Sequence, residues 1–274
     1  MKHIKHFGFF SLALLLLSAC GPEPVERAPE SAPAPQKPAT PMLEHSVVAT
    51  LPHDTSAFTE GLLFYNGQLL ESTGSPEGSS FRSVIGPIDP KTGKLQIKAE
   101  IDGKAYFGEG IVVLNNKIYQ VTYRTQKGFI YDAKTFKKTG EFTYTGEGWG
   151  MTTDGTHIIM SNGTEKLAYF DASFNPVKVL SVTDNGYAQE SLNELEYING
   201  YIYANVWMTG YIVKIDPATG QVVAKLNLTP ISYEVRNMHP YAMEMNGIAY
   251  NAATDQIYIT GKAWPSLYEI KFAH

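Results

Sequence analysis

A two-hairpin unit recurs five times along the chain, and this repeat limits the possible folds more than any other feature. The first half of the unit is an apolar segment, a turn built from Asn, Asp or Gly, and a second apolar segment. Its five copies are GLLFYNGQLLEST (61–73), GIVVLNNKIYQVT (110–122), GMTTDGTHIIMSN (150–162), LEYINGYIYANVW (195–207) and GIAYNAATDQIYITG (247–261). Asn, Asp and Gly tolerate positive φ, so these turns are typical of β-hairpins.

The second half of the unit is a strand followed by an acidic residue and another turn. The acidic residues that mark it are Asp89, Asp132, Asp171, Asp216 and Glu269, at intervals of 39 to 53 residues. Five units of this length, each with four short strands, predict an all-β five-bladed propeller. A large sandwich or jelly roll also has many short strands, but it does not require this periodicity.

The ends of the repeat indicate how the ring closes. The last copy supplies three strands before the chain reaches His274, and the segment 44–51 precedes the first copy without a hairpin of its own. An N-terminal strand there can complete the last blade, which hides both sheet edges. We therefore assign residues 43–274 to one propeller domain.

The N-terminal residues have the features of a lipoprotein signal peptide, which we assign to residues 1–19. Two lysines precede an apolar run at 7–17, which is too short to span a bilayer. The run leads into Leu-Ser-Ala-Cys, which resembles a bacterial lipobox with Cys20 as the lipidated residue. Gly rather than Asp follows Cys20, which favours the outer membrane, facing the periplasm. The alternative is an ordinary secretory signal.

Residues 20–42 begin with the lipidated Cys and continue as a Pro-rich tether. Seven prolines fall in this stretch and little apolar surface offsets the entropy of ordering it.

The charge and the cysteine content of the chain exclude a nucleic-acid partner and a disulfide. A net charge of −5 without a Lys or Arg cluster argues against nucleic acid, and the single Cys excludes an intramolecular disulfide.

In a propeller the loops that enter the innermost strands form the mouth of the channel. Those loops carry Glu60, Glu109, Glu147, Asn193 and Glu194, which we expect to converge at one end. Such a cluster could act in acid/base catalysis through one carboxylate, or it could bind a central metal ion. The structural alternative is that each acid binds loop backbone and the adjacent Gly supplies the turn.

Tryptophan and lysine residues extend this candidate site. Trp149, Trp207 and Trp264 lie near strand ends, and three at comparable positions suggest a shared pocket wall, although a lone Trp is more often in the core. Lys262 lies between Gly261 and an Ala-Trp-Pro segment, which suggests an ordered loop rather than a solvated surface charge. The histidines show no HxH or HxxxH spacing, so a zinc site is poorly supported.

Several motifs resemble those of the plant-type and bacterial glutaminyl-peptide cyclotransferases, or glutaminyl cyclases. The motifs are AFTEGL (57–62), FGEG (107–110), YQVTYR (119–124), GEGWGMTTDG (146–155), NELEYINGYIYANVW (193–207), MNGIAY (245–250) and TGKAWP (260–265). The resemblance covers the chain from about residue 45 to its end. It implies a five-bladed propeller that converts the N-terminal Gln of peptides to pyroglutamate and releases ammonia.

The same resemblance implies roles for individual residues. Glu109 would be the general acid and base, Glu60 would bind the α-amine, and Asn193 and Lys262 would hold the γ-amide and stabilise the oxyanion. The aromatic residues that would bind substrate and exclude water are Phe58, Phe107, Tyr123, Trp149 and Trp207. Tyr123 stands where some members have Trp, which leaves the pocket size open.

The resemblance implies no required cofactor, and it allows a structural cation in the central channel whose ligands are unknown. We expect a monomer that acts on peptides or proteins with N-terminal Gln and reaches the membrane through Cys20. Two other functions remain open at this stage. One is a non-catalytic peptide-binding propeller, and the other is a metal-dependent propeller hydrolase that would lose activity on chelation.

Overall fold

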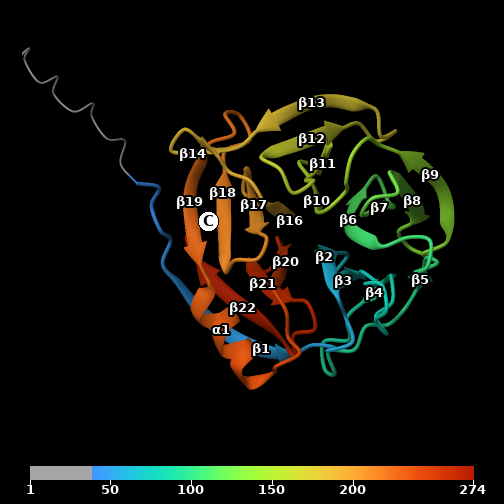
Figure 1. Cartoon of the computed structure of the whole chain (residues 1–274), viewed down its shortest axis with the longest axis horizontal. Coiled ribbons are helices and arrows are strands. Elements are labelled where there is room, and N and C mark those ends of the chain that lie inside the picture. Colours follow the sequence, from blue (N-terminus) through green and yellow to red (C-terminus); the bar gives the residue numbers. More distant parts are fainter. Residues whose placement is uncertain (1–38) are drawn as a thin grey trace, which may run out of the picture. The chain divides into compact units, whose positions relative to one another are not determined.

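The computed structural model describes residues 39–274, and Figure 1 shows five small sheets arranged around a common axis. The predicted signal peptide at 1–19, the lipidation site at Cys20 and nearly all of the predicted tether lie outside the described residues. Between residues 39 and 274, no helix is long and apolar enough to cross a membrane.

Each sheet is one antiparallel four-stranded blade, which confirms the predicted five-bladed propeller. Blade one contains β2 (Thr59–Tyr65), β3 (Gln68–Thr73), β4 (Val84–Pro87) and β5 (Ala99–Glu100). Blade two contains β6 (Gly108–Leu114), β7 (Lys117–Thr122), β8 (Lys127–Asp132) and β9 (Lys138–Thr143). Blade three contains β10 (Met151–Thr153), β11 (Ile158–Met160), β12 (Lys166–Phe170) and β13 (Pro176–Ser181). Blade four contains β16 (Leu192–Ile198), β17 (Tyr201–Val206), β18 (Tyr211–Ile215) and β19 (Val222–Asn227).

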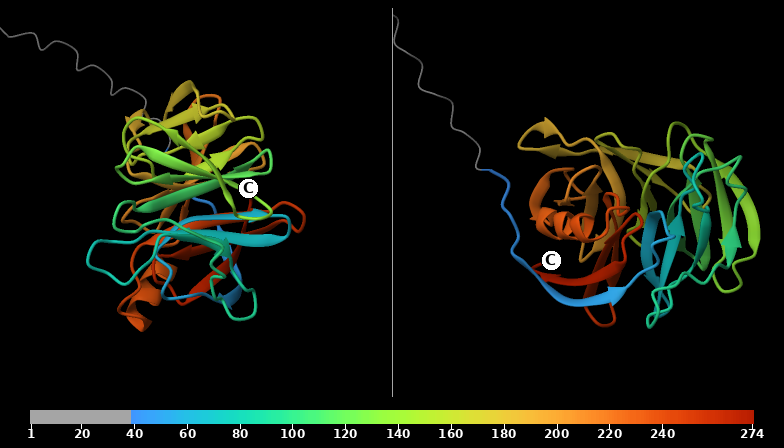
Figure 2. Two further views of the ribbon diagram at one scale, coloured as in Figure 1. Left: turned by 90° about the vertical axis from the view of Figure 1, so that its right-hand side faces the viewer. Right: turned by 60° about the horizontal axis from the view of Figure 1, so that its bottom comes forward.

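Blade five is completed by the N-terminal strand, as predicted. It contains β20 (Met245–Asn251), β21 (Gln256–Gly261), β22 (Ser266–Phe272) and β1 (His45–Pro52). β1 runs antiparallel to β22 with a register from His45 opposite Phe272 to Pro52 opposite Ser266, and Figure 2 shows the blue β1 alongside the red β22. The chain thereby joins its first and last strands in one sheet, so the ring has no open end.

The first strand of each blade is the innermost one. β2, β6, β10, β16 and β20 contact one another in this order, and β20 contacts β2 to complete the circle. The hydrophobic core follows from this arrangement, because it is divided into five clusters, one at each interface between neighbouring blades. Alternating apolar residues on each strand fill these interfaces.

The hairpin turns have the backbone that their sequence predicted. Asn115 and Asn116 both have positive φ (52° and 59°), and Asn66 and Asn199 are each followed by a Gly of positive φ. The acids that marked the second half of the repeat act in turns as well. The Oδ1 atoms of Asp89, Asp132, Asp171 and Asp216 accept backbone N–H groups two to four residues further on. Glu269 differs, because it lies within β22 and accepts a hydrogen bond from Gln256 across the strands.

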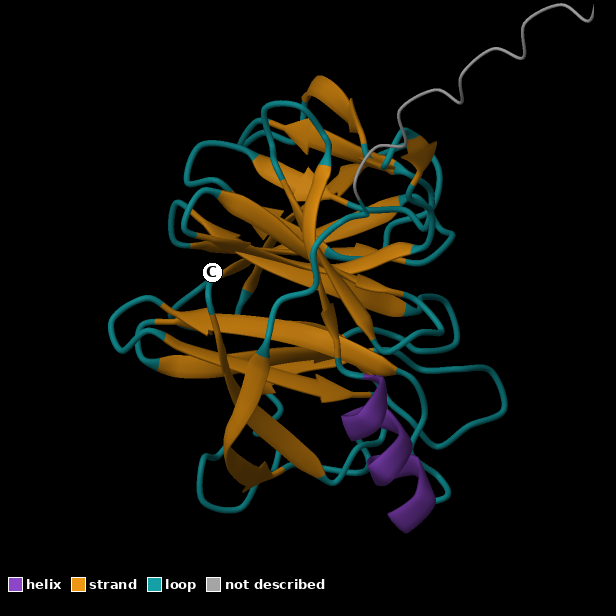
Figure 3. Ribbon diagram, turned by 90° about the vertical axis from the view of Figure 1, so that its left-hand side faces the viewer, coloured by secondary structure: helices purple, strands orange, loops and turns teal. Residues whose placement is uncertain are grey.

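Two short elements were not foreseen from the repeat. The helix α1 (Thr229–Met238), purple in Figure 3, lies in the long connection to β20, with Pro230 in its first turn. Ile231 and Val235 pack it onto the apolar cluster between blades four and five. A small hairpin of β14 (Thr183–Asp184) and β15 (Tyr187–Ala188) precedes blade four.

Candidate active site

In four blades, a β-bulge near the start of the innermost strand directs a polar residue toward the site. The strand register shifts between Thr59 and Gly61, and again at the corresponding points of β6, β16 and β20. A bulge leaves a residue unpaired and re-aims its side chain. The first residues of the bulge pairs are Glu60, Glu109, Asn193 and Asn246, with Trp149 at the corresponding place in blade three. The first three and Trp149 line one pocket.

The second residue of each pair faces the next blade, and there the chain needs glycine. A Cβ on Gly110 would lie 2.5 Å from the carbonyl oxygen of Trp149, and a Cβ on Gly61 would lie 2.8 Å from the nitrogen of Ile111. Gly150 and Gly247 occupy the same place in blades three and five. In blades one to three the innermost strands therefore approach too closely for a side chain at these positions, whereas at Gly247 the nearest atoms are 3.3 Å away and a φ of +115° favours glycine.

Blade four has Glu194 at this glycine position, which corrects the prediction that Glu194 joins the acids of the mouth. Its side chain does not line the pocket but is buried among the innermost strands. Its Oε1 accepts the N–H of Leu62 at 3.1 Å, and its Oε2 accepts the N–H of Ile248 at 2.8 Å. Burial, and then the charge of Glu196, raise the pKa of Glu194 well above its usual value. Glu194 thus joins blade four to blades one and five.

The pocket is a cavity of about 250 Å³ with a closed rim of side chains. The rim consists, in order, of Phe58, Phe107, Tyr123, Trp149, Trp207, Glu244 and Lys262. Ring centroids of successive aromatic residues are 5.5 to 6.3 Å apart. Trp207 Nε1 donates to Glu244 Oε1 at 3.2 Å, Glu244 Oε1 lies 3.1 Å from Lys262 Nζ, and Lys262 Nζ lies 4.7 Å from the centre of the Phe58 ring. All nine predicted catalytic and substrate-binding residues line this one pocket.

The floor of the pocket is formed by Glu60, Glu109 and Asn193. These residues are only 1%, 6% and 3% exposed. Asn193 Oδ1 is buried without a hydrogen-bond partner among residues 39–274. Because buried polar atoms are nearly always hydrogen-bonded, this oxygen is available to a ligand in the pocket.

Lys262 organises the charges above this floor. Its Nζ lies 2.9 Å from Glu60 Oε1, and Glu60 Oε2 accepts a hydrogen bond from Asn246 Nδ2 at 3.2 Å. Burial raises the pKa of Glu60 to about 7, although the positive charge of Lys262 opposes the shift. Burial alone would lower the pKa of Lys262, but the carboxylates of Glu60 and Glu244 outweigh it and hold that pKa above its usual value.

Glu109 lacks a cation of its own. Burial, and next the charge of the nearby Glu60, raise the pKa of Glu109 well above its usual value. When two carboxyl groups interact this strongly they titrate as a pair and can share a proton. The site therefore holds a carboxyl group whose pKa burial and Glu60 raise, beside one that Lys262 helps to ionise. Such a pair can bind a cationic amine and pass a proton.

Glu244 is a pocket residue that the sequence analysis missed. It lies two residues before the bulge of blade five, which is the place that Glu147 occupies in blade three. Each of these acids accepts a hydrogen bond from a rim tryptophan and pairs with a cation, since Glu147 binds Trp149 Nε1 and Arg124 Nε, both at 3.0 Å. Alignment of the five loops on their bulge positions would have identified Glu244. Glu147 itself does not line the pocket, contrary to the prediction that it converges there.

Trp264 corrects a third prediction, because it is not part of the pocket wall. Its side chain is fully buried in the core between blades four and five, where Nε1 donates to the carbonyl oxygen of Met243 at 2.9 Å. Trp264 is therefore a core residue, which is the commoner environment for a lone Trp.

The acids buried among the innermost strands of blade four bind protein backbone. The carboxylates of Glu194 and Glu196 accept backbone N–H groups of the neighbouring blades, including that of Tyr250 at 2.8 Å. Within the described range 39–274, no three His, Cys, Asp or Glu side chains are grouped so that they could hold a metal ion.

Comparison with known proteins identifies the family of this chain. The family model described as glutamine cyclotransferase matches residues 19–272. A glutaminyl-peptide cyclotransferase from Arabidopsis thaliana is 39% identical over 237 residues, which cover 83% of this chain and 71% of that protein. The crystal structure of a glutaminyl cyclase from Myxococcus xanthus aligns with a TM-score of 0.78 and 29% identity, covering 86% of this chain and 98% of that one. The chain therefore belongs to the glutamine cyclotransferase family, of the type found in plants and bacteria.

Proposed function

We propose that this glutaminyl-peptide cyclotransferase uses the Glu60–Glu109 pair to move the protons of ring closure, without a metal ion. The observation that carries the proposal is the pair itself. Two buried carboxyl groups lie in one small pocket, one held by Lys262 at 2.9 Å and the other with a strongly raised pKa. The aromatic rim keeps water from this pair.

The reaction is an intramolecular transfer. The α-nitrogen of an N-terminal Gln forms a bond to its own side-chain Cδ, and the bond from Cδ to the amide nitrogen breaks. The α-ammonium group gives up one proton before the attack and one after it. One of these protons reaches the departing nitrogen, which leaves as ammonia, and the released ammonia takes up the other in solution. Because both reacting groups belong to one residue, holding them in a near-attack geometry contributes much of the rate.

In this proposal Glu109 carries the proton from the α-nitrogen to the departing nitrogen. An α-amine has a pKa of roughly 8, and proton transfer is most efficient between groups of similar pKa. Burial raises the pKa of Glu109 in the right direction for such a match. The Glu60 carboxylate accepts N–H groups of the α-amine on the side opposite Lys262.

Asn193 and Lys262 complete the arrangement around the γ-amide. The unpartnered Asn193 Oδ1 can accept a hydrogen bond from the substrate amide. Lys262, held by Glu60 and Glu244, presents a positive charge in the pocket, where it stabilises the oxyanion that forms when the carbonyl is attacked. Phe58, Phe107 and the two rim tryptophans hold the glutaminyl side chain between them.

The test is ammonia release from a Gln-initiated dipeptide by the soluble domain, with and without EDTA. We expect release in both conditions. Release that EDTA abolishes would overturn metal independence and favour the metal-dependent hydrolase type of site. A folded domain that binds the dipeptide without releasing ammonia would instead be a peptide-binding propeller.

We further propose that the propeller is anchored by a lipid on Cys20 in the bacterial cell envelope, at the outer membrane and facing the periplasm. The lipobox-like sequence before Cys20 and the following Pro-rich stretch support this proposal. A Cys20→Ala variant should leave the membrane fraction. Unchanged membrane partitioning of that variant would contradict it.

A further inference from the structure

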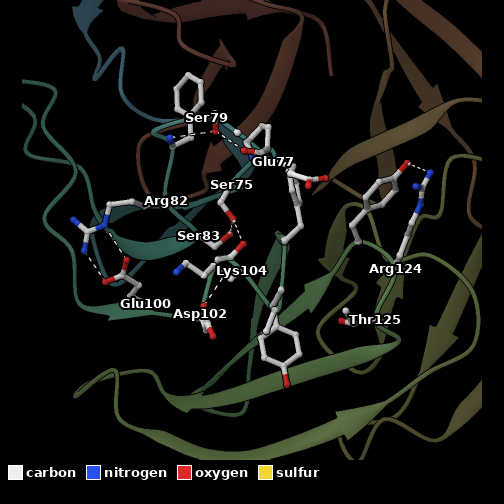
Figure 4. Close-up of a pocket in the computed structure, with 18 residues that line it drawn as sticks. Ser75, Glu77, Ser79, Arg82, Ser83, Glu100, Asp102, Lys104, Arg124 and Thr125 are labelled. Carbon is white, nitrogen blue, oxygen red and sulfur yellow. Dashed lines mark hydrogen bonds and ion pairs between the residues drawn. The ribbon is translucent and has the colours of Figure 1, made fainter.

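A second and larger cavity, of about 770 Å³, lies directly beside the catalytic pocket. Three segments of blades one and two line this groove, at 75–83, 100–107 and 123–125. In Figure 4, Arg82 and Glu100 form an ion pair at one end, Arg124 and Thr125 lie at the other, and Ser75, Ser83 and Lys104 lie between them. Pro76, Phe107 and Tyr123 line both cavities, so the groove and the pocket meet at these side chains.

The rest of a peptide substrate has to leave the pocket across its rim. A cavity of about 250 Å³ accommodates the glutaminyl residue but not the chain that follows it. On the side of blades three to five the rim is held together by the Trp149–Trp207 contact and by the polar link through Glu244 to Lys262. Beyond Phe107 and Tyr123, by contrast, the groove begins at once.

We propose that this groove binds the residues that follow the N-terminal Gln of the substrate, so that the enzyme favours polypeptides over glutamine derivatives without a chain. The inference rests on the proposed function. An extended chain advances about 3.3 Å per residue, so three residues would need about 10 Å of groove. Most of the residues that line the groove are exposed, and most of them lie in loops.

The lining of the groove indicates what kind of chain it accepts. It carries three acidic side chains and three basic ones, which are Glu77, Glu100, Asp102, Arg82, Lys104 and Arg124. Aromatic surface comes from Phe81 and Tyr106. Ser75 and Ser83 bind each other at 2.7 Å on the lining of the groove. Because neither sign of charge dominates, we expect kcat/KM to depend more on the length of the substrate chain than on the charge of the residues after Gln.

The experiment compares kcat/KM for glutamine amide and for a Gln-initiated pentapeptide. We expect the wild-type protein to favour the pentapeptide at least about tenfold, which corresponds to one or two net hydrogen bonds. Ala105→Trp and, independently, Lys104→Trp place a large ring in the groove and should remove this preference while glutamine amide turnover is retained. The matched control is Tyr241→Ala, at an 89% exposed residue of the loop after α1, which should keep the preference.

Equal kcat/KM for the two substrates in the wild-type protein would overturn the proposal. So would pentapeptide kinetics that survive both groove-filling variants. A preference that is lost in Tyr241→Ala alone would place the chain across blades four and five instead. Failure of the proposed function is a separate outcome, because then neither glutamine amide nor the pentapeptide would release ammonia.

Discussion

Glu60 and Glu109 occupy the same bulge position in successive blades, yet their neighbours give them different charges. Lys262 contacts Glu60 at 2.9 Å and opposes the effect of burial, so that the pKa of Glu60 is about 7. Glu109 forms no such ion pair, and burial, followed by the charge of Glu60, raises its pKa well above its usual value. One position in the repeat therefore supplies both a binding carboxylate and a proton carrier.

Replacing Glu109 with Gln tests the proton carrier. Glutamine keeps the shape of the side chain but cannot exchange a proton, so kcat should fall by about 10²- to 10⁴-fold while KM changes little. The measurement is ammonia release over a range of peptide concentrations, with near-UV circular dichroism as the control for folding. A loss of less than about tenfold would assign proton transfer to another group.

The pH dependence of kcat/KM tests the role of Glu60. Below its pKa of about 7 this carboxyl group takes up a proton and loses the negative charge that would hold the α-ammonium group. We therefore expect kcat/KM to fall as the pH drops below about 7, with a slope near tenfold per pH unit. In Glu60→Gln the overall rate should be lower and this acid limb should be absent. A wild-type profile that is flat from pH 8 to pH 5 would contradict the assignment.

Glu244 acts on the site through its neighbours, so we treat it as a positioning residue. In Glu244→Gln the charge facing Lys262 is lost and the link to Trp207 is weakened, and kcat/KM should fall about 10- to 100-fold, as expected for one charged hydrogen bond. The charge of Glu244 also raises the pKa of Glu60, so the acid limb of the pH profile should move to lower pH.

The matched control for Glu244 is Glu147→Gln, which weakens the equivalent link to Trp149 but does not face Lys262. This variant should leave the acid limb in place. If both variants move the limb equally, or neither does, Glu244 has only a structural role.

At the scale of elements, the innermost strands combine a bulge with a close approach between blades. The bulge turns one residue toward the mouth, and the next residue must leave room for the neighbouring strand. Blades one to three meet this requirement with glycine, and blade five has Gly247, whose φ of +115° favours glycine. Blade four has Glu194 at this position, and its carboxylate binds the backbone N–H groups of Leu62 and Ile248. The glycines after Glu60 and Glu109 are therefore set by packing, although they lie beside the reacting groups.

Gly110→Ala tests this packing requirement. The added methyl group would meet the backbone at Trp149, Gly150 and Met151 within 2.8 Å, so the free energy of unfolding should fall by about 3 kcal/mol. Urea unfolding followed by tryptophan fluorescence provides the measurement. The control is Gly200→Ala in a hairpin turn, where φ is +89° and nothing lies within 4 Å, so only a backbone cost of about 1 to 2 kcal/mol is expected. Equal losses in the two variants would show that close approach is unimportant at Gly110.

At the scale of the whole described propeller, stability depends on closing the ring with a strand from the opposite end of the chain. β1 pairs with β22 along its length. The residues just before β1 bind the backbone of Lys225 in β19. The Lys225 N–H donates to the carbonyl oxygen of Pro41 at 2.9 Å, and its carbonyl oxygen accepts the N–H of Leu43 at 2.8 Å. The segment ahead of β1 thus also contacts blade four, in a stretch that the sequence analysis assigned to the tether.

Removing β1 should open the ring. A chain that starts at His53 would expose the edge of β22, so we expect a lower melting temperature, less cooperative unfolding and association through the free strand edge. A chain that starts at residue 39 retains β1 and serves as the control. Scanning calorimetry and analytical ultracentrifugation distinguish the two, and identical melting temperatures with both chains monomeric would contradict this account of ring closure.

The sequence by itself determined the blades, their number and the strand that closes the ring, because each depends on local signals. The hairpin turns with Asn and Gly and the repeat of hairpin pairs can be recognised in the sequence alone. The motifs around Glu60, Glu109 and Lys262 indicated the family. Contacts between distant segments were decided only by the tertiary structure. No local pattern indicates that Glu194 binds residues 132 and 54 positions away, that Trp264 is in the core, or that Glu244 joins Trp207 to Lys262. The physical reason is that a one-residue bulge decides which side chain faces the mouth and which faces the neighbouring blade, and packing across the ring sets that choice.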